Sequence, residues 1–420
     1  MFGAYEDNAP SAMIVKPFLA AAARATGVSA ALLSALWTFP SMLFSAFLVA
    51  WGAEAAQVFV SQGLALAVLA WLQTMPEFAV EAVIAWDAGK NPATAHLAIA
   101  NLTGAIRLLI GIGWPMIYFV AAFAGRRTHG RLPDIQLEPE HAISVMGLLP
   151  PLLWFVVIWW KRSLGAVDAV VLIALYAAYL LALLRTPPQS EEALEDMPPV
   201  ARWAGGLGGT RSALAIGGLF VAGGILLYVT AHPFVNTMLA LATALGVSQF
   251  VFVQWLAPFL SEFPEGVSCF AWAKRVTRAP MALMNLVSSN VNQWTVLAAM
   301  IPLLYGWSHH QAFGTWATFT FDAEQQVEIG LTVVQSILAA LLLMNLRFGW
   351  LDAASLFVLW LVQFLVPTAR EELTVVYLAW CALQIGFFVT KKQELLAPRV
   401  CLEVLRKNRA GKRGSGEVGK

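Results

Sequence analysis

The chain has 420 residues, of which 59% are hydrophobic and 12% are charged, and its mean hydropathy is +0.69. This is too little charge to cover a soluble protein, in which about 25% of the residues are charged. The net charge of +1 also argues against a polyanionic partner such as nucleic acid. The three cysteines, Cys269, Cys381 and Cys401, are isolated, so we expect neither a disulfide framework nor a zinc site. The composition therefore predicts an all-α, polytopic membrane protein.

The apolar stretches predict eleven membrane-spanning helices. Segments such as Ala166–Leu184 and Val327–Met344 approach the roughly 20 apolar residues that cross a bilayer core at about 1.5 Å per residue. The first five predicted spans are 36–60, 62–86, 93–123, 141–160 and 166–184. The other six are 212–238, 248–273, 279–304, 326–346, 350–367 and 372–390.

A polar linker rich in proline, acids and glycine divides the chain near its middle. We therefore predict an N-terminal amphipathic segment, a first repeat of five helices, the linker, a second repeat of five helices, one extra transmembrane helix and a basic tail. These parts are residues 1–35, 36–184, 185–211, 212–367, 372–390 and 391–420. We expect the tail to be solvated and partly disordered.

The distribution of basic residues orients the chain in a plasma (inner) membrane. Cytoplasmic loops carry an excess of Lys and Arg, and the tail has seven such residues: Lys391, Lys392, Arg406, Lys407, Arg409, Lys412 and Arg413. With the C-terminus cytoplasmic, eleven spans put the N-terminus outside. The loops of Arg126 and Lys274 then lie inside, as the rule requires, whereas Lys161 lies outside, against it. Glu6 stands where a cleavable signal needs a positive charge, so we predict that the spans themselves target the chain.

Residues recur across the linker at fixed spacings. A shift of 184 residues aligns Gly165-x-x-Asp168 with Gly349-x-x-Asp352, and it also pairs Asn101 with Asn285, Gly104 with Ser288 and Glu140 with Glu324. A shift of 188 aligns Pro76-Glu77 with Pro264-Glu265. Five spans is an odd number, so the two halves face opposite ways, as in the inverted repeats of secondary transporters. The alternative is that apolar helices resemble one another by composition alone.

Four glutamates lie inside the predicted second and seventh spans: Glu77, Glu81, Glu262 and Glu265. Carboxylates at membrane depth are costly and rarely face lipid, so we expect them to meet a cation, a base or a proton. Thr74, Glu77 and Glu81 share one helical face, as do Glu262 and Glu265. The alternative is that these residues lie at span ends and face water.

Pro76 and Pro264 are expected to break these helices, because proline has no amide donor. Each leaves free the carbonyl oxygen four residues earlier, at Leu72 and at Leu260. A broken helix beside a carboxylate is a cation site, and oxygen ligands suit a hard ion such as Ca²⁺.

The next spans add amide and hydroxyl oxygens. Asn101 lies in the third span, and Asn285, Ser288, Ser289 and Asn292 form a stripe in the eighth. Taken alone, Asn285 and Ser288 fit a packing contact between helices better than an ion site. Acids in a first helical turn are ordinary, so Glu140, Glu324, Asp168 and Asp352 are interpreted as helix starts.

The paired motifs resemble those of the cation/calcium antiporter superfamily, which includes sodium/calcium and proton/calcium exchangers. Each of its two repeats has a Gly-Thr-Ser-x-Pro-Glu run on one helix and a Gly-Asn-x-x-Gly-Ser-Asn run on the next. Here the first pair reads Leu72-Gln73-Thr74-Met75-Pro76-Glu77 and Ala100-Asn101-Leu102-Thr103-Gly104-Ala105-Ile106. The second reads Leu260-Ser261-Glu262-Phe263-Pro264-Glu265 and Met284-Asn285-Leu286-Val287-Ser288-Ser289-Asn290.

The resemblance implies a ten-helix core in which Glu77 and Glu265 are the central calcium carboxylates. It implies that Thr74 and Ser261 line flanking sodium sites, that Asn101 and Asn285 lie near the centre, and that the first helix of each half slides during alternating access. This sequence departs from the pattern at Gln73, Glu262 and Ile106, which bears on the sodium sites more than on the calcium site.

Charge counting predicts a coupling role for protons. Four ionised glutamates exceed the charge of one Ca²⁺, and Arg107 can offset one of them, so a remaining carboxylate is expected to bind a proton. Glu262 and Glu81 are the candidates. Arg107 is a candidate for gating, with an ion pair that merely holds two helices together as the alternative.

We therefore predict a secondary active antiporter that exchanges Ca²⁺ for H⁺ or Na⁺, either monomeric or homodimeric and without a cofactor. A passive cation channel is the main alternative, and Mn²⁺, Mg²⁺ or K⁺ are alternative substrates. The sequence lacks the HExxH and GxSxG motifs of enzymes, and His309-His310 is predicted to be a solvated pair, so an enzyme is not expected.

Overall fold

The computed structural model describes residues 10–56, 59, 74–126, 130, 132–184 and 197–414. In the first half of the chain these form mostly long helices, joined by short 3₁₀ or π segments. They are α1 (Pro10–Ala56), α3 (Met75–Lys90), η1 (Pro92–Thr94), α4 (His96–Leu108), η2 (Leu109–Gly113), α5 (Trp114–Gly125), η3 (Pro139–His141), α6 (Ala142–Gly147), α7 (Leu149–Lys161) and α8 (Ala166–Leu183).

The second half repeats this plan and adds helices at its ends. A short helix, α9 (Pro199–Gly206), lies in the linker. The others are α10 (Gly209–Leu245), α11 (Gln249–Ala273), η5 (Val276–Arg278), α12 (Ala279–Asn292), η6 (Gln293–Leu297), α13 (Ala298–Phe313), α14 (Ala323–Leu342), η7 (Leu343–Asn345), α15 (Trp350–Leu365), η8 (Pro367–Ala369), α16 (Arg370–Val389) and α17 (Ala397–Gly414).

Two short antiparallel strand pairs tie the halves together and have the symmetry of the repeat. β1 (Asp134–Gln136) pairs with β4 (Arg347–Gly349), and β2 (Ser163–Leu164) pairs with β3 (Phe319–Thr320). Ile135 lies opposite Phe348, and Leu164 lies opposite Phe319. The shift of 184 residues carries Ile135 onto Phe319 and Leu164 onto Phe348. It thus maps one strand pair onto the other with strand order exchanged, as a pseudo-two-fold axis requires.

Two irregular features of the helices recur at the same shift. The π-helix η2 maps onto the π-helix η6, residue for residue. The amide of Gly165 donates to Asp168 Oδ2 at 2.8 Å, and the amide of Gly349 donates to Asp352 Oδ2 at 2.8 Å. Asp168 and Asp352 therefore cap the starts of α8 and α15, as predicted. When α4–α5, α6–α7 and α12–α13 are each counted as one segmented helix, the described residues form two inverted repeats of five helices and an extra helix, α16, besides the short α9 and the terminal α17.

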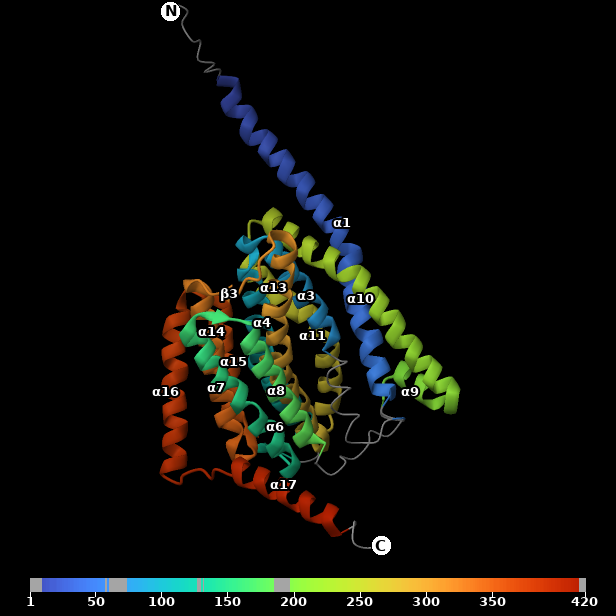
Figure 1. The fold of residues 1–420 in the computed structure, drawn as a ribbon, viewed down its shortest axis with the longest axis vertical. Coiled ribbons are helices and arrows are strands. Elements are labelled where there is room, and N and C mark those ends of the chain that lie inside the picture. Colours follow the sequence, from blue (N-terminus) through green and yellow to red (C-terminus); the bar gives the residue numbers. More distant parts are fainter. Residues whose placement is uncertain are drawn as a thin grey trace, which may run out of the picture.

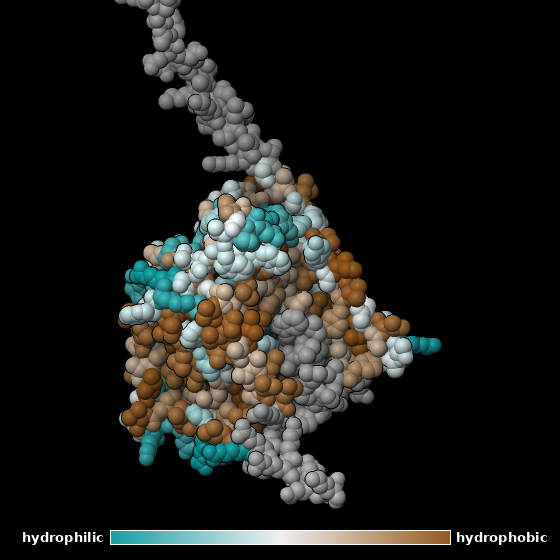
Figure 2. All heavy atoms as spheres, in the orientation of Figure 1, coloured by the Kyte–Doolittle hydropathy of each residue, from teal (hydrophilic) through white to brown (hydrophobic). Residues whose placement is uncertain are grey.

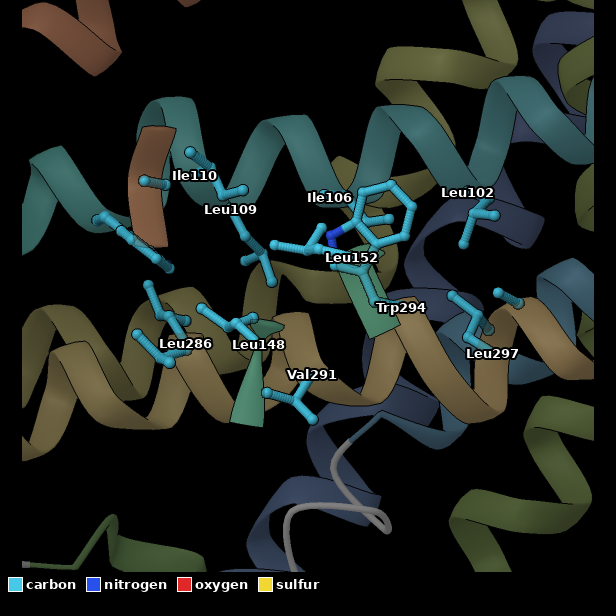
Figure 3. Close-up of a cluster of buried hydrophobic side chains, with 14 of the residues drawn as sticks. Leu102, Ile106, Leu109, Ile110, Leu148, Leu152, Leu286, Val291, Trp294 and Leu297 are labelled. Carbon is cyan, nitrogen blue, oxygen red and sulfur yellow. The ribbon is translucent and has the colours of Figure 1, made fainter. Parts of the chain in front are cut away.

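Figure 1 shows α1 and α10, the first helix of each repeat, side by side along one flank of the bundle, with α16 at the opposite edge. The centre is formed by α3, α4, α11 and α12. Figure 3 shows the repeat-related pairs α4–η2 and α12–η6 facing each other, with Ile106 and Leu109 opposite Leu286 and Trp294. The apolar core of the molecule therefore lies where the two repeats meet.

Hydrophobic side chains form a wide band between two hydrophilic ends (Figure 2). By length and composition, seven helical segments of the described residues can cross a membrane: Gly27–Ala56, Pro92–Gly125, Pro139–Lys161, Ala166–Leu183, Gly209–Leu245, Ala323–Asn345 and Pro367–Val389. The shorter Trp350–Leu365 is also apolar. The helices α3, α11 and α12, which hold the acids and amides described below, are not among these segments. The described part of α3 has 16 residues and is too short to meet the criterion, and polar residues interrupt the apolar sequence of α11 and α12.

The structure differs from our prediction at the two ends of the chain. From Pro10 to Ala56, the predicted N-terminal amphipathic segment and first span form one continuous helix, α1. Part of the predicted second span, 62–73, lies outside the described residues. The tail, which we expected to be partly disordered, contains α17, because Ala397, Val400 and Val404 form an apolar face that packs against the bundle near η3 and α6.

Gly104 provides a test of this packing, because a Cβ atom there would overlap the backbone carbonyl of Gln254 where α4 crosses α11. We predict that Gly104→Ala lowers the free energy of unfolding by about 1–3 kcal/mol through overpacking. Thermal unfolding in detergent measures the effect. Gly217→Ala is the matched control, because nothing lies within 4 Å of its added Cβ. Equal melting temperatures for the two variants would contradict the predicted close crossing.

Candidate cation-binding site

Two of the four glutamates come from α3. This helix starts at Met75, and Pro76 is tolerated because amides of the first turn need no helical acceptor. The exposed fractions of Glu77 and Glu81 are 2% and 0%, and one helical turn separates them. Both carboxylates are therefore buried, which excludes the span-end, water-facing alternative for them.

The other two glutamates come from α11. Glu262 is 7% exposed and Glu265 is 9% exposed. We expected a broken helix here, but α11 is continuous through Pro258 and Pro264. Pro264 nevertheless has no amide hydrogen to donate to the carbonyl of Leu260. The other predicted free carbonyl, at Leu72, lies outside the described residues.

An asparagine on the following helix holds one glutamate in each half. Asn101 Nδ2 donates to Glu81 Oε2 at 2.7 Å, and Asn285 Nδ2 donates to Glu265 Oε1 at 2.6 Å. These pairs are related by the shift of 184, whereas the sequence motifs paired Glu77 with Glu265 at a shift of 188. The four-residue difference is about one helical turn, so both alignments select the same face of the helix.

Side chains from η6 and α12 join the two halves. Gln293 Nε2 donates to Glu77 Oε1 at 3.0 Å and to Glu262 Oε1 at 2.7 Å. Asn292 Nδ2 donates to Thr74 Oγ1 at 2.7 Å. Glu77 also interacts electrostatically with Glu265, and Glu262 interacts with both of them. Carboxylates from the two repeats thus gather in one buried region.

The serines divide between this region and other contacts. Ser289 Oγ donates to Glu265 Oε1 at 2.6 Å. Ser261 Oγ donates to the carbonyl of Ala257 in its own helix at 3.0 Å, which leaves the lone pairs of Oγ available. Ser288, which we had placed among the ion ligands, instead accepts a hydrogen bond from Tyr179 on α8 at 2.9 Å. The structure therefore brings Ser289, not Ser288, to the glutamates.

Several buried oxygens in the region receive no hydrogen bond from any residue that the structure describes. They are Glu81 Oε1, Asn101 Oδ1, Glu262 Oε2, Asn290 Oδ1 and Asn292 Oδ1. Buried acceptors almost always have partners, because an unpaired polar atom costs about 1–3 kcal/mol. A cluster of such oxygens beside carboxylates has the donor chemistry that can bind a cation.

No base neutralises these carboxylates: within the described part of the chain, no ion pair reaches Glu77, Glu81, Glu262 or Glu265. Arg107, which we counted as an offsetting charge, is instead paired with Glu328 on α14. Across the same residues, no three His, Cys, Asp or Glu side chains converge closely enough to hold a metal by themselves. Ligands to a cation must therefore include amide, hydroxyl or carbonyl oxygens.

Sequence reasoning missed two residues near the site. Gln293 bridges the carboxylates of Glu77 and Glu262. The only feature of the sequence that pointed to Gln293 was its position at the end of a run of polar residues that begins in α12. Glu54 on α1 is buried and accepts a hydrogen bond from Ser268 Oγ at 2.8 Å, three residues beyond Glu265. A lone carboxylate in an apolar span was the signal for Glu54.

The two halves of the chain, residues 29–185 and 216–369, match the family model described as "Sodium/calcium exchanger protein". The chain belongs to this family. It is accordingly an integral membrane protein of a family of cation exchangers. The gap between the matched segments coincides with the linker, so the family match divides the chain where the repeats divide it.

Solved structures share the fold of this sodium/calcium exchanger family member. The crystal structure of the H⁺/Ca²⁺ exchanger CAX is 29% identical with a TM-score of 0.80, and the match covers 90% of this chain and 91% of CAX. The sodium-calcium exchanger NCX_Mj is 19% identical with a TM-score of 0.52, covering 81% of this chain and 99% of NCX_Mj, which indicates the fold alone. Comparison with curated proteins found no match.

The two adjacent serines of α12 test the geometry. We predict that Ser289→Ala weakens Ca²⁺ binding by about tenfold, because it removes a charged hydrogen bond worth about 1.5–3 kcal/mol. Ser288→Ala should leave binding within about twofold, because its partner is Tyr179. The Ca²⁺-dependent rise in melting temperature measures both. A larger loss in Ser288→Ala than in Ser289→Ala would contradict the assignment.

Proposed function

We propose that this protein is a secondary active antiporter that exchanges Ca²⁺ for H⁺ or Na⁺ by alternating access. The observation that carries the proposal is a cluster of buried oxygens beside carboxylates from both repeats, for which the described part of the chain offers no hydrogen-bond donor. Burying such a cluster costs free energy when no group compensates its charge, and a bound cation removes that cost. The site lies between the repeats, as in secondary transporters of inverted topology.

The ligand chemistry supports Ca²⁺ as the substrate. Ca²⁺ takes about 6–8 oxygen ligands in a flexible arrangement, whereas Mg²⁺ demands a stricter octahedron. We propose that Glu77 and Glu265 are the central metal ligands, and that Thr74, Asn101, Ser261 and Asn285 add oxygens or position them. Mn²⁺, Mg²⁺ or K⁺ as the substrate is the alternative. Ser288 is left out of this set because it bonds Tyr179.

The charge of the site supports proton coupling. Because Arg107 is paired with Glu328, it offsets none of the four glutamates. One Ca²⁺ leaves a net negative charge among them if all are ionised, and low dielectric favours protonation of one carboxylate. Glu262 stands where the family has a hydroxyl, and Glu81 is held by Asn101, so these two are the proposed proton carriers. The structurally similar CAX is an H⁺/Ca²⁺ exchanger, which agrees with this choice.

We propose that α1 and α10 move during transport. They pack along each other and against the site helices α3 and α11 (Figure 1). A glycine from each helix lies at their contact: a Cβ on Gly52 would lie 3.3 Å from the ring of Phe220, and a Cβ on Gly223 would lie 2.9 Å from a Val49 methyl carbon. Sliding of this pair would open the site to one side and then to the other.

The proposed orientation puts the C-terminus in the cytoplasm and the N-terminus outside, in the plasma (inner) membrane. The loop of Lys274, Arg275 and Arg278 contacts the end of α5, where Arg126 lies. The helix α17 packs against η3 and α6, directly after β1, at this same end. Basic residues thus gather at one end of the bundle, as cytoplasmic ends require.

Flux measurements test the proposed function. We predict that ⁴⁵Ca²⁺ uptake into proteoliposomes requires an imposed gradient of H⁺ or Na⁺. Glu77→Gln and Glu265→Gln should each lower uptake by on the order of 10- to 100-fold, because each removes a charged ligand worth about 1.5–3 kcal/mol. Glu372→Gln is the matched control, because Glu372 is an exposed acid of α16. Uptake that needs no counter-ion would favour a passive channel instead.

The coupling role of Glu262 has its own test. We predict that wild-type ⁴⁵Ca²⁺ uptake depends on pH and that Glu262→Gln removes most of this dependence, because glutamine cannot carry the proton. Glu81→Gln is the parallel variant for the second candidate. Uptake in Glu262→Gln and in Glu81→Gln that stays as pH-sensitive as in the wild type would exclude both residues as proton carriers.

A further inference from the structure

A second buried charge cluster lies on α14, outside the site. Glu328 is fully buried, and both of its oxygens face arginines. Arg107 on α4 pairs with Oε2, and Arg370 Nε on α16 lies 2.7 Å from Oε1. The carboxylate of Glu328 therefore sits between two guanidinium groups, one from the first repeat and one from the extra helix.

The same carboxylate also holds α11. Gln254 Nε2 donates to Glu328 Oε2 at 3.0 Å. The backbone of Gln254 lies against Gly104, where α4 and α11 cross so closely that a Cβ would not fit. Thus Glu328 binds one side chain from each of two helices at their crossing. Those helices are the ones that carry Asn101 and the pair Glu262 and Glu265.

A shell of neutral groups completes the cluster. Gln363 Oε1 on α15 accepts from Arg107 at 3.4 Å. Its amide nitrogen donates to Gln335 Oε1 at 3.1 Å and to the hydroxyl of Tyr377 on α16 at 2.7 Å. The extra helix α16 thus contributes both Arg370 and Tyr377 to a network that is otherwise built from the repeats.

The repeat symmetry shows that this charge is not required by the fold. The shift of 184 residues carries Ser144 onto Glu328, Tyr179 onto Gln363 and Gly104 onto Ser288. Ser144, Tyr179 and Ser288 form a neutral chain, with O···O distances of 3.1 and 2.9 Å. At the equivalent place, one repeat uses hydroxyl groups and the other uses a buried ion cluster that reaches α16.

We propose that Glu328, Arg107 and Arg370 are positioning residues, which fix the crossing of α4 and α11 and so set the distance between the Asn101–Glu81 pair and the carboxylates of α11. The proposal makes α16 a working part of the transport unit, and its effect on transport rests on the function proposed above. A buried ion cluster contributes little net stability but penalises every arrangement that leaves one of its charges unpaired. It therefore selects one register of the two helices.

The test compares the two acids that bind Arg370. Glu328→Gln removes the buried partner of both arginines, whereas Glu324→Gln removes an exposed partner of Arg370, 3.1 Å away. We expect Glu328→Gln to raise the KM for Ca²⁺ at least about tenfold with a smaller change in maximal rate. Glu324→Gln and Tyr179→Phe, which cuts the neutral chain, should leave KM within about twofold. Arg370→Lys should retain most of the affinity.

A folded Glu328→Gln protein with wild-type KM would overturn the proposal. If Glu328→Gln does not fold, Gln254→Met makes the same test, because it removes the bond to α11 without leaving a buried charge unpaired. A second readout is independent of transport. The melting temperature should fall in Glu328→Gln and recover in part when Arg370→Gln is added, and additive losses would overturn the cluster. Absence of driven uptake in the wild type would instead refute the proposed function.

Discussion

A carboxylate buried among membrane-spanning helices must be paired, and this protein meets that requirement in two different ways. In the site between the repeats, Glu77, Glu81, Glu262 and Glu265 receive hydrogen bonds from neutral amides and a hydroxyl, and no base of the described chain pairs with them. Their charge is therefore left for a mobile cation or proton. On α14, Glu328 forms ion pairs with two arginines, so protein groups compensate its charge. The arrangement of the four site glutamates suits ion exchange, whereas the ion pairs of Glu328 suit a fixed contact between helices.

The pseudo-two-fold symmetry organises both solutions. The strand pairs, the two π-helices and the two Asn–Glu bonds all repeat at a shift of 184 residues. π-helical turns are frequent at functional sites, and here η6 starts with Gln293, which bridges Glu77 and Glu262. Where the two repeats differ, the helices keep their arrangement and the side chains change. Glu328 replaces the equivalent of Ser144, and α16 packs on the half that carries the added charge.

The motifs predicted much of the site, since acids, amides and prolines are conspicuous in apolar helices. Glu77, Glu265, Asn101 and Asn285 could be identified because nothing in a membrane core favours them without a partner. The motif could not choose between Ser288 and Ser289, because adjacent residues differ by about 100° around a helix and the contacting face depends on its neighbours. The sequence also could not decide between the two roles considered for Arg107, gating and an ion pair between helices, because the choice depends on its partner. Its partner, Glu328, lies 221 residues away in the chain.

The sequence by itself determined the membrane-spanning all-α architecture, the division into two repeats and the acidic, oxygen-rich character of the site, because these follow from composition and local spacing. Only the tertiary structure decided which oxygens meet. It joined Glu77 to Glu262 through Gln293 and removed Arg107 from the charge balance of the site. It also left Oδ1 of Asn101 and Oδ1 of Asn292 without a donor among the residues that the structure describes. Such contacts depend on the packing of helices far apart in the chain, and no local pattern encodes that packing.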